Sequence, residues 1–456
     1  MLAALGWVKH GAAKPVPARD IDEEREADEE FDGVDVPQED EDSDEEMQED
    51  EEASALNRAR QAALSAGADD LSIYNLDDYD NEEDDTGLIE QMNDDFNEDG
   101  FEDDDLSDID DVTIRPTDAI LLGVHTEEDV SHLDMYVYES KDDNLYVHHD
   151  ILIPSHPLCV EWLDYHSTNP GSSGTHQGNL AAVGTFEPEI QIWDMDIIDA
   201  LTPVMVLGGE LPESKRVAKR LKNKKRNNEA HTDAVMGLAW NRMGRNFLAS
   251  CSADHSIKLW DLSKGSCLLT MTQHNDKVQS IQWHPTEATV LLSAAYDKTA
   301  RVTDVRSPNG GKFCDLSADA ECIQWMNNSP EYFMVSAEDG TVTCYDVRNL
   351  NQQIWTLMAH GKPVSGLSYN RCVNNLLATS STDKQIKFWN ISEQKPKLLH
   401  TIKVGFPVFA LSWYNDDSQP FLLAAGGEGD GQSEDEGRLN VWDARHFEPV
   451  ANAFVQ

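Results

Sequence analysis

The sequence predicts an all-β protein, a seven-bladed β-propeller with a long disordered acidic insertion near its N-terminus. Three observations favour this fold: short strands that end in an aromatic residue, turn residues between them, and repetition of the whole unit along the chain. The clearest unit, residues 231–261, contains three short apolar or alternating segments separated by turns that carry Gly244 and Asp254. Because one such unit cannot bury its own apolar faces, it must stack against further copies.

The unit repeats at a fixed spacing. Trp240 in its first strand and Trp260 in its third strand, named positions a and c, lie 20 residues apart. Successive a positions are 42 to 44 residues apart, which matches the four-stranded blade of a β-propeller of the WD-repeat type. The same interval of 20 residues separates a from c in three further units: Trp283 and Thr303, Trp325 and Tyr345, and Tyr369 and Trp389.

Polar residues recur in phase with the aromatic residues. One set of His, Ser and Asp would suggest nucleophilic catalysis, but sets that recur at identical spacing indicate a structural role, because an enzyme needs only one site. In WD-repeat proteins the matching residues form a hydrogen-bonded network with the tryptophan at position c. The predicted members are His231, Ser250, Asp254 and Trp260, then His274, Ser293 and Asp297, and finally His360, Thr379, Asp383 and Trp389.

We therefore predict a protein that is not an enzyme and has no catalytic residues, no metal site and no cofactor. No P-loop, HExxH or dinucleotide-binding motif is present. The seven cysteines include no CxxC pair, so neither a zinc site nor a disulfide framework is indicated, and a reducing compartment is expected. No apolar run is long enough to span a bilayer and no secretory signal is recognised, so we expect a soluble intracellular protein.

The charge of the chain is strongly negative and unevenly distributed. The formal net charge is -51, and residues 20–111 contain 42 acidic and three basic residues. A segment so acidic and so poor in large apolar residues is expected to be disordered. The predicted organisation is strand a of blade one in residues 1–11, an acidic insertion over residues 12–117, and the rest of the propeller over residues 118–456.

Two short segments interrupt the acidic composition. Residues 53–66 contain helix-forming residues with apolar positions along one side, and residues 73–80 place aromatic residues among carboxylates. Each is either a docking segment that becomes ordered on a partner or nascent structure without a role. Ser43 and Ser107 lie in an acidic context that favours phosphorylation, which would add negative charge.

The first blade is predicted to be divided by the insertion. Residues 4–7 resemble a strand a, and a step of 24 residues back from Trp162 reaches Tyr138 in an alternating strand. We therefore predict that residues 1–9 form strand a of blade one. The alternative is a disordered leader in which Trp7 is incidental. The other three strands of this blade are expected at residues 119–124, 133–139 and 145–153.

A basic loop follows blade two, which has Trp162 at position a and Trp193 at position c. Residues 208–230 contain eight lysines and arginines within twelve positions. Clusters of this density serve as nuclear-import signals or bind nucleic acid, and the alternative is a solvated loop without a role. The eight residues are Lys215, Arg216, Lys219, Arg220, Lys222, Lys224, Lys225 and Arg226.

The last blade completes the ring. Trp413 and Trp442 occupy positions a and c of blade seven, and residues 448–454 fall where its strand d belongs. Seven blades close a ring that leaves no free sheet edge. The seven predicted a positions are Trp7, Trp162, Trp240, Trp283, Trp325, Tyr369 and Trp413.

The order of these features resembles the periodic tryptophan protein 1 family of WD-repeat proteins. The resemblance covers nearly the whole chain and includes the N-terminal Trp strand, NLDDYD in the acidic insertion, YVHHDILIPSHPLCVEWL, IQIWDMDIIDAL, the basic loop and HTDAVMGLAWN. It implies a nuclear and nucleolar scaffold of ribosome biogenesis that acts in pre-ribosomal RNA processing or in ribosomal RNA gene transcription.

Three functions follow from these expectations. The leading hypothesis is a monomeric scaffold whose partners are pre-ribosomal or chromatin assemblies, including ribosomal proteins or histones, with RNA contacted through the basic loop. The first alternative is a chromatin module that binds histones, and the second is a substrate adaptor of a ubiquitin ligase. Parallel capture of histones and pre-ribosomes discriminates the first two, whereas no sequence feature particularly favours the third.

Overall fold

A computed structural model describes residues 1–19, 113–127, 130–165, 178–198, 200–209, 230–392, 395–429 and 439–454. All of them belong to one compact unit, which comprises residues 1–23 and 112–456. Most of the predicted acidic insertion, both predicted phosphorylation sites and the eight basic residues of the loop after blade two lie outside the described residues.

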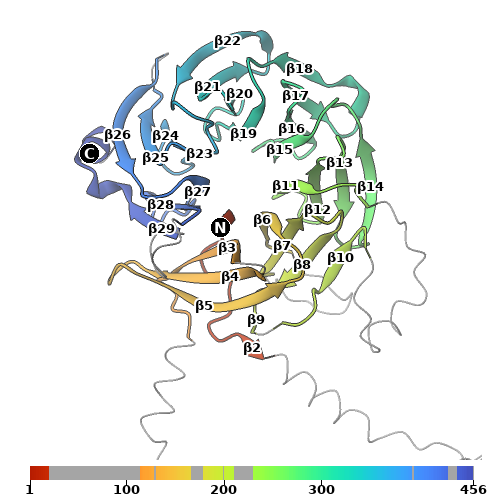
Figure 1. The fold of residues 1–456 in the computed structure, drawn as a ribbon, viewed down its shortest axis with the longest axis vertical. Helices are drawn as coiled ribbons and strands as arrows, with labels where there is room; N and C mark the ends of the chain where they lie inside the picture. The colour runs from red at the N-terminus through yellow and green to blue at the C-terminus, as the bar shows by residue number, and fades with distance from the viewer. Residues whose placement is uncertain are drawn as a thin grey trace, which may run out of the picture. The chain divides into compact units, whose positions relative to one another are not determined.

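Seven antiparallel sheets stand around a central axis, with the first strand of each sheet nearest the axis (Figure 1). The predicted fold class, a seven-bladed β-propeller, is therefore confirmed. Blade one contains β1 (Leu2–Trp7), β3 (Ala119–Glu127), β4 (Val130–Glu139) and β5 (Asn144–Ile153). Blade two contains β6 (Pro157–Leu163), β7 (Leu180–Thr185), β8 (Ile190–Asp194) and β10 (Met205–Leu207).

The next four blades each have four strands in sequence order. Blade three contains β11 (Val235–Trp240), β12 (Phe247–Ser252), β13 (Ile257–Asp261) and β14 (Ser266–Met271). Blade four contains β15 (Val278–Trp283), β16 (Val290–Ala295), β17 (Thr299–Asp304) and β18 (Lys312–Asp315). Blade five contains β19 (Ala320–Trp325), β20 (Tyr332–Ala337), β21 (Thr341–Asp346) and β22 (Asn349–Met358). Blade six contains β23 (Gly366–Tyr369), β24 (Leu376–Ser381), β25 (Gln385–Asn390) and β26 (Lys397–Lys403).

Blade seven differs from the prediction at its outer edge. It contains β27 (Val408–Trp413), β28 (Leu422–Gly427) and β29 (Leu439–Asp443), and within the described residues no fourth strand pairs with β29. The prediction that residues 448–454 form strand d is wrong, because this segment is the helix α6 (Glu448–Phe454). Pro449 is tolerated in the first turn of a helix, and Val450 is completely buried in the cluster that also holds Phe447.

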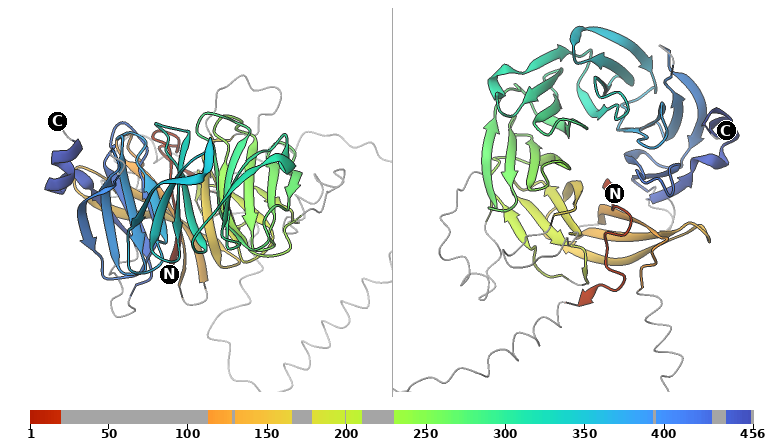
Figure 2. Two further views of the ribbon diagram at one scale, coloured as in Figure 1. Left: turned by 90° about the horizontal axis from the view of Figure 1, so that it is seen from above. Right: turned by 180° about the vertical axis from the view of Figure 1, so that it is seen from behind.

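The N-terminal strand lies where the repeat spacing placed it. β1 pairs antiparallel with β3, with Trp7 opposite Leu121 and Leu5 opposite Gly123. A segment of more than a hundred residues therefore separates two neighbouring strands of one sheet. Figure 2 shows that β1 lies next to blade seven at the centre of the ring, whereas α6 lies at the outer rim.

The ordered chain extends beyond the boundary expected after Gly11. The short strand β2 (Ala18–Arg19) pairs in parallel with β9 (Ile197–Ile198), and the Lys14 amide donates to Asp196 Oδ1 over 3.2 Å. The Ile114 amide donates to Pro15 O over 2.9 Å. The two ends of the insertion therefore lie side by side, and its first residues are fastened to blade two.

The second strand of each blade is almost wholly buried. β12, β16, β24 and β28 are rich in Ala, Ser and Leu, and nearly every residue in them is inaccessible to solvent. A strand that carries neighbouring blades on both faces must be apolar or small on both faces, so it reads as a continuous run rather than an alternation. Face-to-face packing of the sheets is thus the main source of stability.

Hydrogen bonds between blades add direction to this packing. In four blades the indole Nε1–H of the tryptophan at position a donates to a backbone carbonyl of the preceding blade. The acceptor is in each case the residue just before that blade's own a position. These bonds join Trp7 to Ser412 O (3.0 Å), Trp283 to Ala239 O (3.0 Å), Trp325 to Gln282 O (3.4 Å) and Trp413 to Ser368 O (3.1 Å).

A second set of bonds is made by the residue that follows position a. Its polar side chain reaches a backbone carbonyl in the a–b turn of the following blade. The pairs are Asn241 Nδ2 with Ala288 O (2.7 Å), His284 Nε2 with Pro330 O (3.1 Å) and Asn370 Nδ2 with Pro420 O (2.6 Å). Consecutive blades are therefore joined at the same level of the ring, close to the channel.

The bond from Trp7 closes the ring, and this leads to a stability prediction. We expect Trp7→Phe to lower the free energy of unfolding by about 1–2 kcal/mol, since it removes the Ser412 bond but keeps an aromatic ring. Trp193→Phe is the matched control, because the buried Nε1–H of Trp193 has no partner among the described residues. Urea unfolding followed by far-UV circular dichroism measures both. Equal losses for the two variants would contradict the closing role of Trp7.

Candidate functional site

The recurring polar residues of blade three form one continuous hydrogen-bonded chain. Trp260 Nε1–H donates to Ser250 Oγ over 2.8 Å, Ser250 Oγ lies 2.7 Å from His231 Nε2, and His231 Nδ1 lies 3.0 Å from Asp254 Oδ2. Ser250 and the His231 side chain are completely buried. No substrate can reach this serine, although the order of groups is that of a catalytic triad.

The same chain is present in blade six and shortened in blade four. In blade six, Trp389 Nε1–H donates to Thr379 Oγ1 over 3.0 Å, and His360 joins Thr379 (2.9 Å) to Asp383 (3.0 Å). In blade four, His274 joins Ser293 (2.9 Å) to Asp297 (3.0 Å) without a tryptophan. The residue at its position c, Thr303, instead donates to Gln273 Oε1.

Blade five replaces its missing histidine with a residue that the sequence pattern did not single out. Ser317 Oγ donates to Asp339 Oδ2 over 2.9 Å. Ser317 lies eight rather than nine residues before Trp325, so a search at the exact histidine spacing misses it. A hydroxyl residue within one position of the expected histidine is the signal that could have found it.

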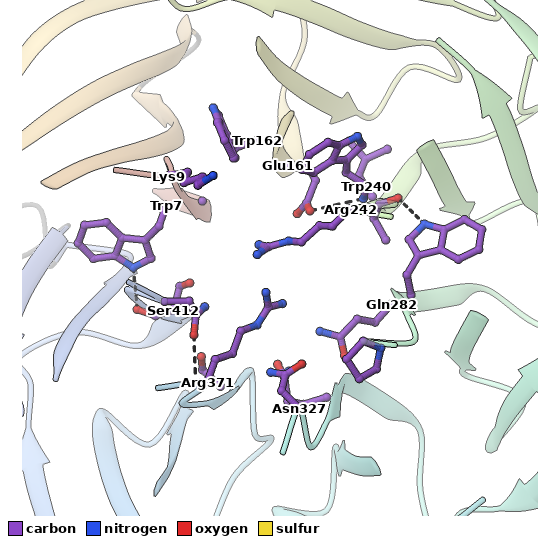
Figure 3. Close-up of a pocket in the computed structure, with 18 of the residues that line it drawn as sticks. Trp7, Lys9, Glu161, Trp162, Trp240, Arg242, Gln282, Asn327, Arg371 and Ser412 are labelled. Carbon is purple, nitrogen blue, oxygen red and sulfur yellow. Dashed lines mark hydrogen bonds between the residues drawn. The ribbon is translucent and has the colours of Figure 1, made fainter. Parts of the chain in front are cut away.

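A cavity of about 690 Å³ opens on the side of the ring where the a strands end. Residues from all seven blades line it (Figure 3). Its wall includes seven residues that each lie two positions after an a aromatic: Lys9, Asp164, Arg242, Pro285, Asn327, Arg371 and Asn415. The sequence analysis did not identify this wall, which becomes visible once the column two residues after position a is compared between blades.

Three arginines in the cavity wall have different surroundings. Arg245 forms an ion pair with Asp164, with 2.6 Å between Nη2 and Oδ1. Arg242 and Arg371 project into the centre of the channel from opposite sides (Figure 3). Neither of their guanidinium groups forms a hydrogen bond or an ion pair with any other residue that the structure describes. The Glu161 carboxylate lies in the same wall and accepts a hydrogen bond from the Trp240 amide over 3.4 Å.

Comparison with known proteins assigns the chain to a family. The family model "WD domain, G-beta repeat" matches residues 222–261, 265–304 and 351–390. The chain is 37% identical to an uncharacterized WD repeat-containing protein of Schizosaccharomyces pombe, over 85% of this chain and 76% of the relative. It is 32% identical to the periodic tryptophan protein 1 homolog of Drosophila melanogaster, over 72% of this chain and 69% of the relative. The chain belongs to the periodic tryptophan protein 1 family.

A third relative agrees with this assignment. Periodic tryptophan protein 1 of Saccharomyces cerevisiae is 33% identical over 70% of this chain and 66% of its own length. The chain thus spans about two thirds to three quarters of these relatives. In this member of the family, tryptophans recur because four of them at position a join neighbouring blades and two at position c complete the buried polar chains.

The buried aspartates of this family member are held in their ionised form. Burial alone would raise the pKa of Asp254, but hydrogen bonds from His231, Ser256 and the Thr232 amide outweigh it and place that pKa well below its usual value. Asp297 is lowered in the same way by His274, the Asn275 amide and Thr299. An ionised aspartate at Nδ1 fixes the proton there, so Nε2 accepts from the hydroxyl, whose oxygen is free to accept from the indole.

Other kinds of site are not indicated in the described part of the chain. Across these residues, no group of three or more His, Cys, Asp or Glu side chains is arranged to hold a metal ion. All seven cysteines are described and unpaired, and burial raises the pKa of Cys159 to about 12. Among the described residues no helix is long and apolar enough to cross a membrane.

The difference between blades three and four gives a prediction about these buried chains. Ser250→Ala leaves both His231 Nε2 and Trp260 Nε1 without a partner, whereas Ser293→Ala leaves only His274 Nε2. We expect Ser250→Ala to lower the free energy of unfolding by about 1–3 kcal/mol more than Ser293→Ala, because each buried polar atom that loses its partner costs about that much.

Chemical denaturation of the two variants in parallel measures this difference. The two serines make a matched pair, since both lie at the same position of their blades and are almost fully buried. A larger loss for Ser293→Ala would show that the tryptophan bond does not strengthen the chain in blade three.

Proposed function

We propose that the protein is a non-enzymatic scaffold of nucleolar ribosome biogenesis, acting in pre-ribosomal RNA processing or ribosomal RNA gene transcription. The observation that carries the scaffold role is the complete burial of the His–Ser and His–Thr pairs, whose hydrogen-bonding groups are used to hold blades together. What remains accessible is a rigid ring with two charged insertions. The ribosomal role is supported by the resemblance to the periodic tryptophan protein 1 family.

The two insertions carry opposite charges and suit different partners. The acidic segment, residues 20–111, would bind basic proteins such as ribosomal proteins through many weak contacts. The basic loop, residues 208–230, would bind either RNA or an import receptor. Contacts of both kinds weaken steeply as salt concentration rises, since each replaces condensed or bound counterions.

The basic loop gives the test of this function. We expect replacement of its eight lysines and arginines with alanine to abolish nucleolar accumulation or pre-ribosome association, because the loop is the main concentration of positive charge in the chain. Fluorescence microscopy and sedimentation of tagged protein with pre-ribosomal particles measure the two properties. Unchanged location and unchanged sedimentation would reject this part of the proposal.

A control with the same loss of charge separates the loop from net charge in general. Eight cationic residues at the surface of the blades are replaced with alanine, and we expect location and association to remain normal. Ion pairs at such exposed sites contribute little to stability. The control residues are Lys264, Arg306, Lys312, Arg348, Lys362, Lys397, Lys403 and Arg445.

Histone binding is the second candidate, and the acidic composition of residues 20–111 favours it. Histone tails are basic, so a segment with 42 acidic residues would attract them as it would attract ribosomal proteins. Capture of purified histones and of pre-ribosomal particles on the same immobilised protein distinguishes the two. Retention of histones alone, with normal ribosomal RNA processing in depleted cells, would favour the chromatin role.

A further inference from the structure

Arg242 and Arg371 differ from other arginines of the described structure in lacking a carboxylate partner. At the rim of the ring, Arg306, Arg348 and Arg445 each form a hydrogen-bonded ion pair with the aspartate two residues earlier. Arg245 does the same with Asp164 inside the cavity. Two unpaired guanidinium groups that face the same space are therefore an exception within this chain (Figure 3).

The placement of these two side chains is unfavourable without a ligand. Burial in the channel, together with the nearby charge of Arg242, lowers the pKa of Arg371 to about 9. The group still carries its proton at neutral pH, so two positive charges repel each other in a confined space. An anion between them would remove this repulsion and satisfy donors that have no partner in the described structure.

The charges around the channel mouth are positive on balance. Among the seven residues two positions after an a aromatic, Lys9, Arg242 and Arg371 are cations and Asp164 is the one carboxylate, which is already paired with Arg245. Glu161 offsets one further charge. A positive cavity in a chain with a net charge of -51 indicates selective attraction of a small anionic group.

We propose that this cavity binds a phosphate monoester, with the guanidinium groups of Arg242 and Arg371 as its principal ligands. A phosphate dianion balances two guanidinium charges and offers three oxygens to their planar forks, whereas a carboxylate balances one. The cavity volume of about 690 Å³ leaves room for the group that carries the phosphate. That carrier is either a phosphorylated side chain of a partner peptide or a free small phosphate ester.

A nucleic acid fits this cavity less well. A strand places a phosphate on every nucleotide, so its neighbouring phosphates would approach the carboxylates of the rim, including Asp164 and Asp416. Binding of a strand would also be opposed by the charge of the whole chain. A single phosphate that enters the channel on a narrow carrier avoids both costs.

Glu161 provides an internal check on the sign of the ligand charge. Burial raises the pKa of Glu161, and the charges of Arg242 and Arg371 act in the opposite direction. An ionised Glu161 competes with an anion for the two guanidinium groups. We therefore expect Glu161→Gln to tighten phosphate binding about two- to tenfold, while its amide oxygen keeps the hydrogen bond from the Trp240 amide.

The experiment titrates the full chain with four probes: inorganic phosphate, glycerol phosphate, a phosphoserine tripeptide and the same tripeptide without its phosphate. Isothermal titration calorimetry gives each dissociation constant. We expect phosphate-bearing probes to bind and the unphosphorylated tripeptide not to bind. Tighter binding of the phosphopeptide than of glycerol phosphate identifies a peptide carrier, and the reverse order identifies a small ester.

Variants assign the binding to the channel. We expect Arg242→Gln and Arg371→Gln each to weaken phosphate binding at least about tenfold, since each removes a charge-assisted pair of hydrogen bonds. Arg348→Gln makes the same substitution at the outer rim and should leave binding unchanged. Thermal unfolding verifies that every variant is folded, and loss of either unpaired arginine should not lower stability.

Three results would overturn the proposal. One is the absence of binding by all phosphate-bearing probes at about 10 mM, well above the range of specific sites. The second is equal affinity of wild type, Arg242→Gln and Arg371→Gln. The third is weaker phosphate binding by Glu161→Gln, which would mean that Glu161 and not the arginine pair is the main ligand-binding group.

Discussion

The hydrogen bond from an indole to the backbone of the preceding blade is the interaction on which the rest of the structure depends. Apolar packing between sheets is strong but has little direction, so it does not by itself fix the level of one blade against the next. A buried N–H that must find one carbonyl does fix it. The bond from Trp7 to Ser412 O is the one that joins the last blade to the first and so closes the ring.

Much of the fold was predictable because its spacing is written directly in the sequence. The interval between positions a and c located the blades, and it recovered β1 across the acidic segment. Residues 448–454 were predicted wrongly because their position in the repeat outweighed Pro449, which favours the first turn of a helix. The pairing of β2 with β9 has no periodic signal, since two residues are too few to show one.

The candidate site was less accessible to sequence reasoning. The buried polar chains could be predicted because His, Ser and Asp recur at fixed distances. Arg242 and Arg371 lie at equivalent positions of blades three and six, but only the closed ring places them across one channel. The same closure explains the position of Glu161, which joins the Trp240 amide and faces both arginines. Ring closure therefore builds the cavity as well as the fold.

The most direct test of this account is hydrogen exchange of the tryptophan indoles, measured by NMR on protein labelled with ¹⁵N-tryptophan. If the indole bonds hold a closed ring, the Nε1–H of Trp7 exchanges as slowly as those of Trp283 and Trp413, through global unfolding alone. Fast exchange of Trp7 beside slow exchange of Trp283 would show that blade one opens separately, and it would contradict the closing role of the N-terminal strand.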